Sequence, residues 1–149
     1  FDGVDNYLKT TAFTLNQPSQ VSMLVNLLTD TANDYYCDGN TGDRFGWWIS
    51  NATTNTLTLY AGSNGPAGIY TPATYQVISG VSAGASSSLR IDGTTTTGNA
   101  GANNMGGFTL GAYATGPAQF GNIAVKEIII RNVNDATIRA NDHAYLQTL

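Results

Sequence analysis

The chain has 149 residues, a net charge of -4 and a pI near 4.5, and only 11% of its residues are charged. Its 42% hydrophobic content suffices for a core burying about two-thirds of the unfolded surface, which argues against intrinsic disorder. The acidic balance argues against nucleic-acid binding, and without an apolar run of roughly 18 residues no membrane insertion is expected.

The chain is rich in threonine, serine, asparagine and glycine, which take the surface positions that lysine and glutamate usually hold. This composition is common in exported or surface-exposed β-rich proteins. We predict one domain over residues 1–149. Because the sequence starts at Phe1 rather than at methionine, we expect this domain to be a module or a processed part of a longer chain.

Alternation of apolar and polar residues with period two dominates the chain and predicts β-strands. The first strong segment, residues 20–28, places Val21, Met23, Val25 and Leu27 on one face. The later predicted strands cover residues 44–50, 56–62, 74–82, 88–93, 106–113 and 125–133. The last of these is apolar at consecutive positions, which is typical of a strand covered on both faces.

Turn-forming residues separate the strands, and residues 93–107, rich in glycine and asparagine, are predicted as one long loop. Only the end of the chain changes period. Asp135 is a predicted helix N-cap, and Ile138, Tyr145 and Leu149 then fall on one side of a short terminal helix. Many short strands with such punctuation predict an all-β sandwich or barrel.

Five stretches carry a resemblance by their order along the chain. They are FDGVDNYL (1–8), AFTLNQPSQVSMLVNL (12–27), YQVISGVSAGASSSLRIDG (75–93), FTLGAY (108–113) and KEIIIRNVNDATIRANDHAYL (126–146). In this order they resemble the opening strand, second strand, central hairpin, final strands and helical tail of laminin-G-like domains, within the concanavalin A-like lectin/glucanase superfamily. The resemblance spans nearly the whole chain and implies a jelly-roll β-sandwich of two antiparallel sheets with a short C-terminal helix.

Some members of this superfamily bind calcium through acidic residues, and two departures weaken that implication. Asn6 follows Asp5 where two aspartates are frequent, and Ala124 stands between Gly121 and Glu127 where an acidic residue is common. The resemblance therefore leaves calcium as an open hypothesis.

The residues themselves offer two groups of oxygen ligands for calcium. One is Asp2 with Asp5, and the other is the loop that holds Asp38, Asn40 and Asp43. The loop lacks the terminal glutamate of the twelve-residue calcium-loop pattern, and an Asp-Gly turn explains its composition without an ion. We prefer the interpretation of all four aspartates as turn and strand-entry residues over calcium ligands.

Catalysis is not predicted, and no catalytic residue is assigned. Glycoside hydrolysis generally needs two carboxylates flanking the bond, but Glu127 is the only glutamate and its neighbours EIIIRN contain no second acid. His143, the only histidine, has no serine motif to serve and is predicted to be exposed or capping. Cys37 is alone and is interpreted as a buried, inert thiol. An aspartate pair from separate strands keeps a glycoside hydrolase or lyase as a third hypothesis.

Sugar binding is the preferred function, because sugars stack on aromatic rings and bind to side-chain amides. Trp47 and Trp48 are adjacent on one predicted strand and must point to opposite faces. Trp47 shares its parity with Phe45 and Ile49 and is predicted in the core. Trp48 is then either an exposed stacking platform or packed beneath a loop. The remaining candidate ligand contacts are Tyr35, Tyr36, Asn40, Tyr60 and Tyr113.

The sequence thus predicts a non-catalytic recognition or adhesion module, extracellular or on a virion surface, that binds carbohydrate on a cell surface or matrix. The alternative is a structural or decoration domain of a phage particle or surface fibre, in which the aromatic residues contact neighbouring protein subunits. No cofactor is predicted other than the hypothetical calcium ion.

Overall fold

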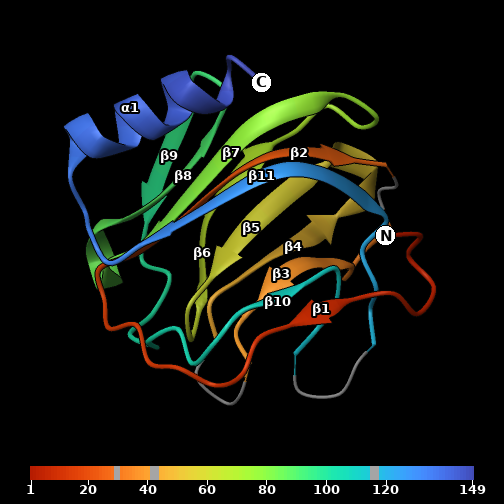
Figure 1. Ribbon diagram of the computed structural model, residues 1–149, viewed down its shortest axis with the longest axis horizontal. Helices are drawn as coiled ribbons and strands as arrows, with labels where there is room; N and C mark the ends of the chain where they lie inside the picture. Colours follow the sequence, from red (N-terminus) through yellow and green to blue (C-terminus); the bar gives the residue numbers. More distant parts are fainter. Residues whose placement is uncertain (29–30, 41–43, 115–117) are drawn as a thin grey trace.

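The computed structural model describes residues 1–28, 31–40, 44–114 and 118–149. Its strands form two antiparallel sheets that face each other across one core (Figure 1). The six-stranded sheet has the order β1 (Leu8–Lys9), β10 (Thr109–Leu110), β3 (Tyr35–Asp38), β4 (Gly46–Asn51), β5 (Thr56–Tyr60) and β6 (Asn64–Ile69). The five-stranded sheet has the order β11 (Ile123–Arg131), β2 (Ser19–Leu27), β7 (Tyr75–Ser82), β8 (Ser87–Ile91) and β9 (Thr94–Gly98).

Three short helical segments complete the fold. They are η1 (Ala52–Thr54), η2 (Gly84–Ser86) and α1 (Ala136–Leu146). Helix α1 lies over the outer face of the five-stranded sheet, so the outer face of the six-stranded sheet is on the far side of the molecule from it (Figure 1). Among the described residues, no helix combines the length and apolarity needed to cross a membrane.

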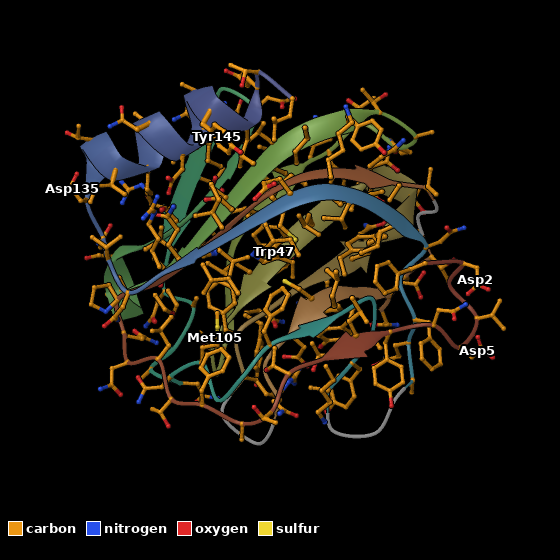
Figure 2. The ribbon with its side chains drawn as sticks, in the orientation of Figure 1. Asp2, Asp5, Trp47, Met105, Asp135 and Tyr145 are labelled. Atoms are coloured by element: carbon orange, nitrogen blue, oxygen red, sulfur yellow. The ribbon has the colours of Figure 1, made fainter. Side chains whose placement is uncertain are left out.

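The alternation in β2 positions the core as predicted. Its residues Val21, Met23, Val25 and Leu27 are buried against the inward side chains of the other sheet. Trp47, the largest fully buried side chain, lies between the sheets (Figure 2). The predicted all-β sandwich with a short C-terminal helix is therefore confirmed.

The prediction of a long loop over residues 93–107 is wrong for its first part, which is strand β9. β9 pairs with β8 through a tight turn at Asp92 and Gly93, in which Asp92 has a φ of 48°. The four threonines from Thr94 to Thr97 are β-branched and favour an extended backbone, so they continue the sheet after the turn.

In two strands of the five-stranded sheet, the apolar residues divide between the central core and the cluster under α1. In β7, Val77 packs under helix α1 with Leu24, and it is Ile78 that enters the central core. β11 was predicted to be buried on both faces. It is instead an edge strand, and other residues cover its two faces only in part. Ile128 contacts the core and Ile129 contacts the cluster under α1, but both remain half-buried.

The terminal helix begins where predicted and packs differently. The Asp135 side chain caps it by accepting the N–H groups of Thr137 and Ile138, at 2.8 and 3.0 Å. Tyr145 is nevertheless half-exposed (Figure 2), and the buried residues of α1 include His143 and Leu146. Of the two predictions for His143, exposure is wrong, because the side chain is buried; the residue lies in the last turn of α1, where its carbonyl oxygen accepts the N–H of the C-cap residue Gln147.

Candidate functional site

The outer face of the six-stranded sheet carries a stacked pair of aromatic rings. Because Trp47 enters the core, its neighbour Trp48 must point outward from β4. The register of β3 with β4 pairs Trp48 with Tyr35, and their rings stack with centroids 6.0 Å apart and an interplanar angle of 14°. Trp48 remains partly exposed beside the buried Tyr35.

Two more tyrosines and an arginine extend this pair. Tyr113, which follows β10, meets Tyr35 edge-on with ring centroids 5.1 Å apart. The guanidinium carbon of Arg44 lies 4.5 Å from the ring centroid of Tyr113, 4.6 Å from that of Tyr60 and 5.1 Å from that of Tyr35. We name Tyr35, Arg44, Trp48, Tyr60 and Tyr113 the aromatic cluster. Arginine–ring contacts at these distances are favourable cation–π interactions.

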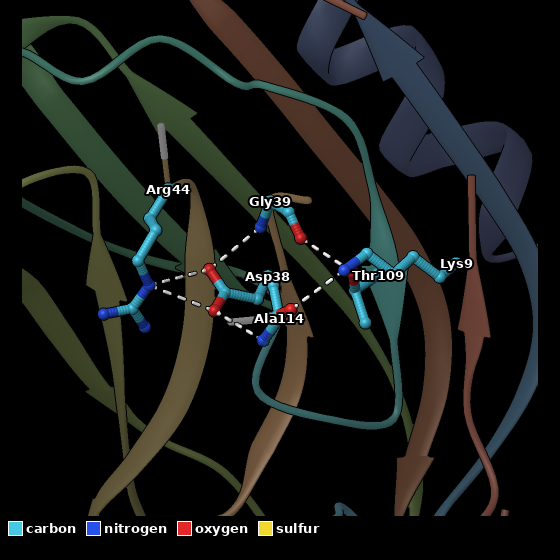
Figure 3. A network of polar contacts seen from close by, with 6 residues as sticks. All are labelled: Lys9, Asp38, Gly39, Arg44, Thr109 and Ala114. Atoms are coloured by element: carbon cyan, nitrogen blue, oxygen red, sulfur yellow. Dashed lines mark hydrogen bonds and ion pairs between the residues drawn. The ribbon is translucent and has the colours of Figure 1, made fainter. Parts of the chain in front are cut away.

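A buried ion pair fixes the arginine of the cluster (Figure 3). Arg44 Nε donates to both carboxylate oxygens of Asp38, at 3.1 Å to Oδ2 and 3.3 Å to Oδ1. Asp38 is fully buried and also accepts the backbone N–H groups of Gly39 at 2.8 Å and Ala114 at 3.2 Å. Burial raises the pKa of Asp38 above its usual 3.8, and the charge of Arg44 opposes the shift.

Two contacts tie the surrounding strands to this ion pair. The Thr109 hydroxyl donates to the carbonyl oxygen of Gly39 at 2.7 Å, and Lys9 Nζ donates to the carbonyl oxygen of Ala114 at 2.9 Å (Figure 3). Both carbonyls belong to residues whose N–H groups bind Asp38. The carboxylate thus joins β3 to the segment that follows β10, and Lys9 adds β1 to the same network.

Two hydrogen-bond donors in the aromatic cluster lack acceptors. Arg44 Nη2 and Trp48 Nε1 are buried, and neither has a partner in the described part of the chain. An unsatisfied buried donor costs about 1–3 kcal/mol. A ligand that brings oxygen acceptors to these atoms recovers part of that cost.

The structure brings together four of the six predicted ligand contacts, Tyr35, Trp48, Tyr60 and Tyr113. Tyr36 lies in the core, edge-on to Tyr70 with ring centroids 6.4 Å apart, and is removed from the candidate contacts. Asn40 Nδ2 donates to the carbonyl oxygen of Thr10 at 2.6 Å and so has a structural partner. Sequence reasoning missed Arg44, although an arginine among many aromatic residues in a charge-poor chain was a usable signal.

The four aspartates proposed as calcium ligands have different outcomes in the structure. Asp2 and Asp5 lie at the N-terminal corner of the molecule (Figure 2), where Asp2 Oδ1 accepts the N–H of Val4 at 3.0 Å. That turn lowers the pKa of Asp2. Asp38 is removed from the candidates because its oxygens are occupied by Arg44 and two amides, and Asp43 lies outside the described residues.

Nowhere in the described ranges do three or more histidine, cysteine, aspartate or glutamate side chains gather around one point. Calcium binding at Asp2 and Asp5 therefore stays a prediction. Cys37 is buried as predicted, and this burial raises the pKa of its thiol.

A half-buried carboxylate stands next to the cluster, at Asp34. Desolvation raises its pKa from 3.8 to about 6, although a hydrogen bond from Thr31 acts in the opposite direction and lowers the pKa. Because the folded pKa exceeds the unfolded one, the stability linked to this group is fully present below pH 3.8 and is lost as the pH rises through about 6. The ionised form of Asp34 therefore destabilises the fold at neutral pH.

We expect Asp34→Asn to be more stable than the native chain at pH 7, with the difference disappearing near pH 4. The gain should be below about 1 kcal/mol, because solvent screens a half-exposed carboxylate. Thermal unfolding at both pH values measures it. Asp5→Asn, the same change at an exposed carboxylate, is the control. A gain at pH 4 equal to that at pH 7 would contradict the argument.

Comparison with known proteins places the fold. No family model matches the chain, and a search of curated proteins gives no significant relative. Among solved structures, domains LG4-5 of the mouse laminin α1 chain match with a TM-score of 0.64 and 12% identity, over 90% of this chain and 40% of that one. The LG1-3 region of the laminin α2 chain matches with a TM-score of 0.62 and 10% identity, over 85% and 25%.

A sialidase of Trypanosoma rangeli, solved in complex with sialic acid, matches with a TM-score of 0.63 and 14% identity. The match covers 93% of this chain and 26% of the sialidase, so this chain spans well under half the length of each of these proteins. At such low identity the similarity concerns the fold alone. The fold of the chain is therefore similar to that of laminin G domains.

Proposed function

We propose that this chain is a non-catalytic recognition module, working at an extracellular or virion surface, that binds carbohydrate at the aromatic cluster. The observation that carries the proposal is the grouping of the partly exposed Tyr60 and Tyr113 around the guanidinium of Arg44, with the partly exposed Trp48 stacked on Tyr35, which the same guanidinium contacts. Sugar rings bind by apolar contact with aromatic faces combined with directional hydrogen bonds. The cluster supplies ring faces, phenol hydroxyls and a guanidinium on one surface.

The same geometry supports recognition over hydrolysis. The carboxylate that touches the cluster is Asp38, which is buried and saturated by Arg44 and backbone amides. Glu127 lies in β11 of the other sheet. Cleavage of a glycosidic bond needs two carboxyl groups within about 5–10 Å across the bond. The other described carboxylate next to the cluster is Asp34, and Asp38 is a poor partner for it because its oxygens already bind Arg44 and two backbone amides.

A glycan array with the purified chain tests the proposal, with calcium and again with a chelator. We expect binding to a restricted set of glycans, reduced about tenfold or more in Trp48→Ala and in Tyr60→Ala, because a lost stacking contact of about 1.4 kcal/mol is a factor of ten. Tyr145→Ala, which removes a half-exposed tyrosine on α1, is the matched control and should bind normally.

Thermal unfolding of each variant separates lost contacts from lost folding. Equal binding by the native chain, Trp48→Ala and Tyr60→Ala would refute this location of the site. Binding that disappears with the chelator would instead point to Asp2 and Asp5. A folded chain that binds no glycan and assembles into oligomers would favour the structural alternative, in which the cluster contacts neighbouring subunits.

A further inference from the structure

Helix α1 rests on the outer face of the five-stranded sheet through a small buried face (Figure 1). Its buried residues are Asp142, His143 and Leu146, and of these only Leu146 is apolar, packing with Leu24 and Val77. Isolated helices of 11 residues are marginal in water, so the order of α1 depends on this face. Elements held by few buried apolar contacts open locally while the rest of a fold stays intact.

The two ionisable residues of this face differ in their partners. The Asp142 carboxylate accepts Nη2 of Arg131 at 2.7 Å, Nε of Arg131 at 2.8 Å and Nε2 of Gln20 at 2.9 Å. His143 is 4% exposed, and its Nδ1 is buried without a hydrogen-bond partner. A protonated imidazole carries an N–H on both ring nitrogens. Protonation of His143 would therefore bury a charged donor that has no acceptor, which is costly.

The charges nearest to His143 do not compensate for that cost. Arg90 on β8 repels a proton on the imidazole, whereas Asp92, just beyond β8, attracts it. The carboxylate of Asp92 is already bound, because it accepts Nε2 of Gln76 at 2.7 Å and the N–H of Val77 at 3.0 Å. Both carboxylates near the imidazole thus have other donors.

The other strands and the helix itself add little negative charge at this point. β2 and β7, the strands that α1 contacts most, contain no charged residue. The remaining charged residues of β11 and α1 are Lys126, Glu127, Arg131, Arg139 and Asp142. Asp142 is paired with Arg131, and Glu127 lies on β11, which β2 and β7 separate from β8.

We propose that α1 is a pH-sensitive cover of the five-stranded sheet, docked while His143 is neutral and released when the imidazole takes up a proton. Release uncovers the apolar side chains of Leu24 and Val77, which are 7% and 2% exposed in the docked state. Because α1 lies on the opposite side of the molecule from the aromatic cluster, this inference does not depend on carbohydrate binding.

The direction of the pH dependence follows from the site. Burial and the charge of Arg90 lower the pKa of His143 from 6.5, and Asp92 acts against them. Since the pKa of the docked imidazole lies below that of the free one, the docking free energy linked to His143 is fully present above pH 6.5. It is lost as the pH falls through the docked pKa.

Two measurements on the native chain test the proposal. His143 is the only histidine, so an NMR titration of its ring needs no assignment, and we expect a pKa below 6.5. Hydrogen exchange at pH 7 and pH 5, corrected for the intrinsic rates, measures the opening of residues 140–146. We expect the opening constant to rise about tenfold at pH 5, within the limit of about thirtyfold that a free imidazole of pKa 6.5 sets there. Amides of β4, in the other sheet, should not follow.

Variants assign the response to the imidazole. His143→Gln keeps a polar side chain without a proton to gain, and His143→Leu also removes the unpaired nitrogen, so both should open equally at the two pH values. Asp142→Asn should weaken docking at both pH values and keep their ratio. Asp34→Asn is the control, because it removes a group on the other sheet that titrates near pH 6, and should keep the full response.

Three results overturn the inference. They are an imidazole that titrates at 6.5 or above in the native chain, equal opening of α1 at pH 7 and pH 5, and a response that remains in full in both His143 variants. The first two are measured on the native chain, so they decide the question even if a variant fails to fold.

Discussion

Gly80→Ala is expected to destabilise the protein by about 1–3 kcal/mol, the usual cost of overpacking a core. Gly80 lies in the middle of β7 and faces the other sheet. A Cβ atom there would stand 2.4 Å from Nε1 of Trp47 and 3.2 Å from Cδ1 of Leu59. Trp47 is fully buried between the sheets, so its indole can move aside only by displacing other core side chains.

The clash involves the indole N–H edge, so a smaller ring at position 47 should relieve it. Trp47→Phe alone leaves a cavity and lowers the free energy of unfolding. Combined with Gly80→Ala, it should cost less than the sum of the two single changes, with a coupling of about 0.5–3 kcal/mol. Urea unfolding of the native chain, both single variants and the double variant measures this cycle.

Gly93→Ala is the matched control for this experiment. Gly93 lies in the turn between β8 and β9, and a Cβ atom added there meets nothing within 4 Å. Its substitution should change the free energy of unfolding little, apart from a small gain from a stiffer unfolded chain. Additive costs in the double variant, or equal effects at Gly80 and Gly93, would show that Trp47 does not abut β7 as described.

Removal of the cluster's arginine should have a still larger effect. Arg44→Ala leaves the carboxylate of Asp38 buried with only backbone donors, and breaking a buried pair in this way costs about 3–5 kcal/mol. Arg131→Ala offers a direct comparison. The side chain of Arg131 is 44% exposed, against 14% for Arg44, so its loss should cost about 1 kcal/mol or less.

The pH dependence identifies the cause of the loss. Without Arg44, the folded pKa of Asp38 rises further above 3.8, so the stability linked to this carboxyl is present below pH 3.8 and is lost as the pH rises through the folded pKa. Arg44→Ala should therefore approach native stability at pH 4 and lose it at pH 7. Adding Asp38→Asn to Arg44→Ala should recover stability at pH 7. Equal destabilisation at the two pH values would mean that lost packing, not an unpaired charge, is responsible.

The site was predictable where it depends on one strand and unpredictable where it depends on several. Adjacent residues on a strand face opposite sides, so the separation of Trp47 from Trp48 follows from the sequence alone. The same rule separates Tyr35 from Tyr36, but it does not say which of the two is outside. The register of β3 with β4 decides that, by placing Tyr35 opposite Trp48.

Helix α1 shows the same division. A capping aspartate acts on the next three residues, so Asp135 was predictable. The face that the helix buries depends on the sheet beneath it. That surface is mixed: Leu146 packs against Leu24 and Val77, while Gln20 binds Asp142 of the helix, and Tyr145 is left half-exposed. A helical periodicity that counts only apolar residues cannot predict the buried face of a helix that packs on a partly polar sheet surface.

The sequence by itself determined the strand-rich all-β class, the inward face of β2 and the start of α1, because period, turn chemistry and capping act over a few residues; the two-sheet sandwich was implied by the resemblance to laminin-G-like domains. Only the tertiary structure decided that the rings of Tyr113 and Tyr60 lie around the guanidinium of Arg44. It also decided that Asp38 forms an ion pair with this arginine and is not a calcium ligand. These residues come from four segments of the chain. Their meeting depends on strand order and register, which are set by the packing of the whole sandwich.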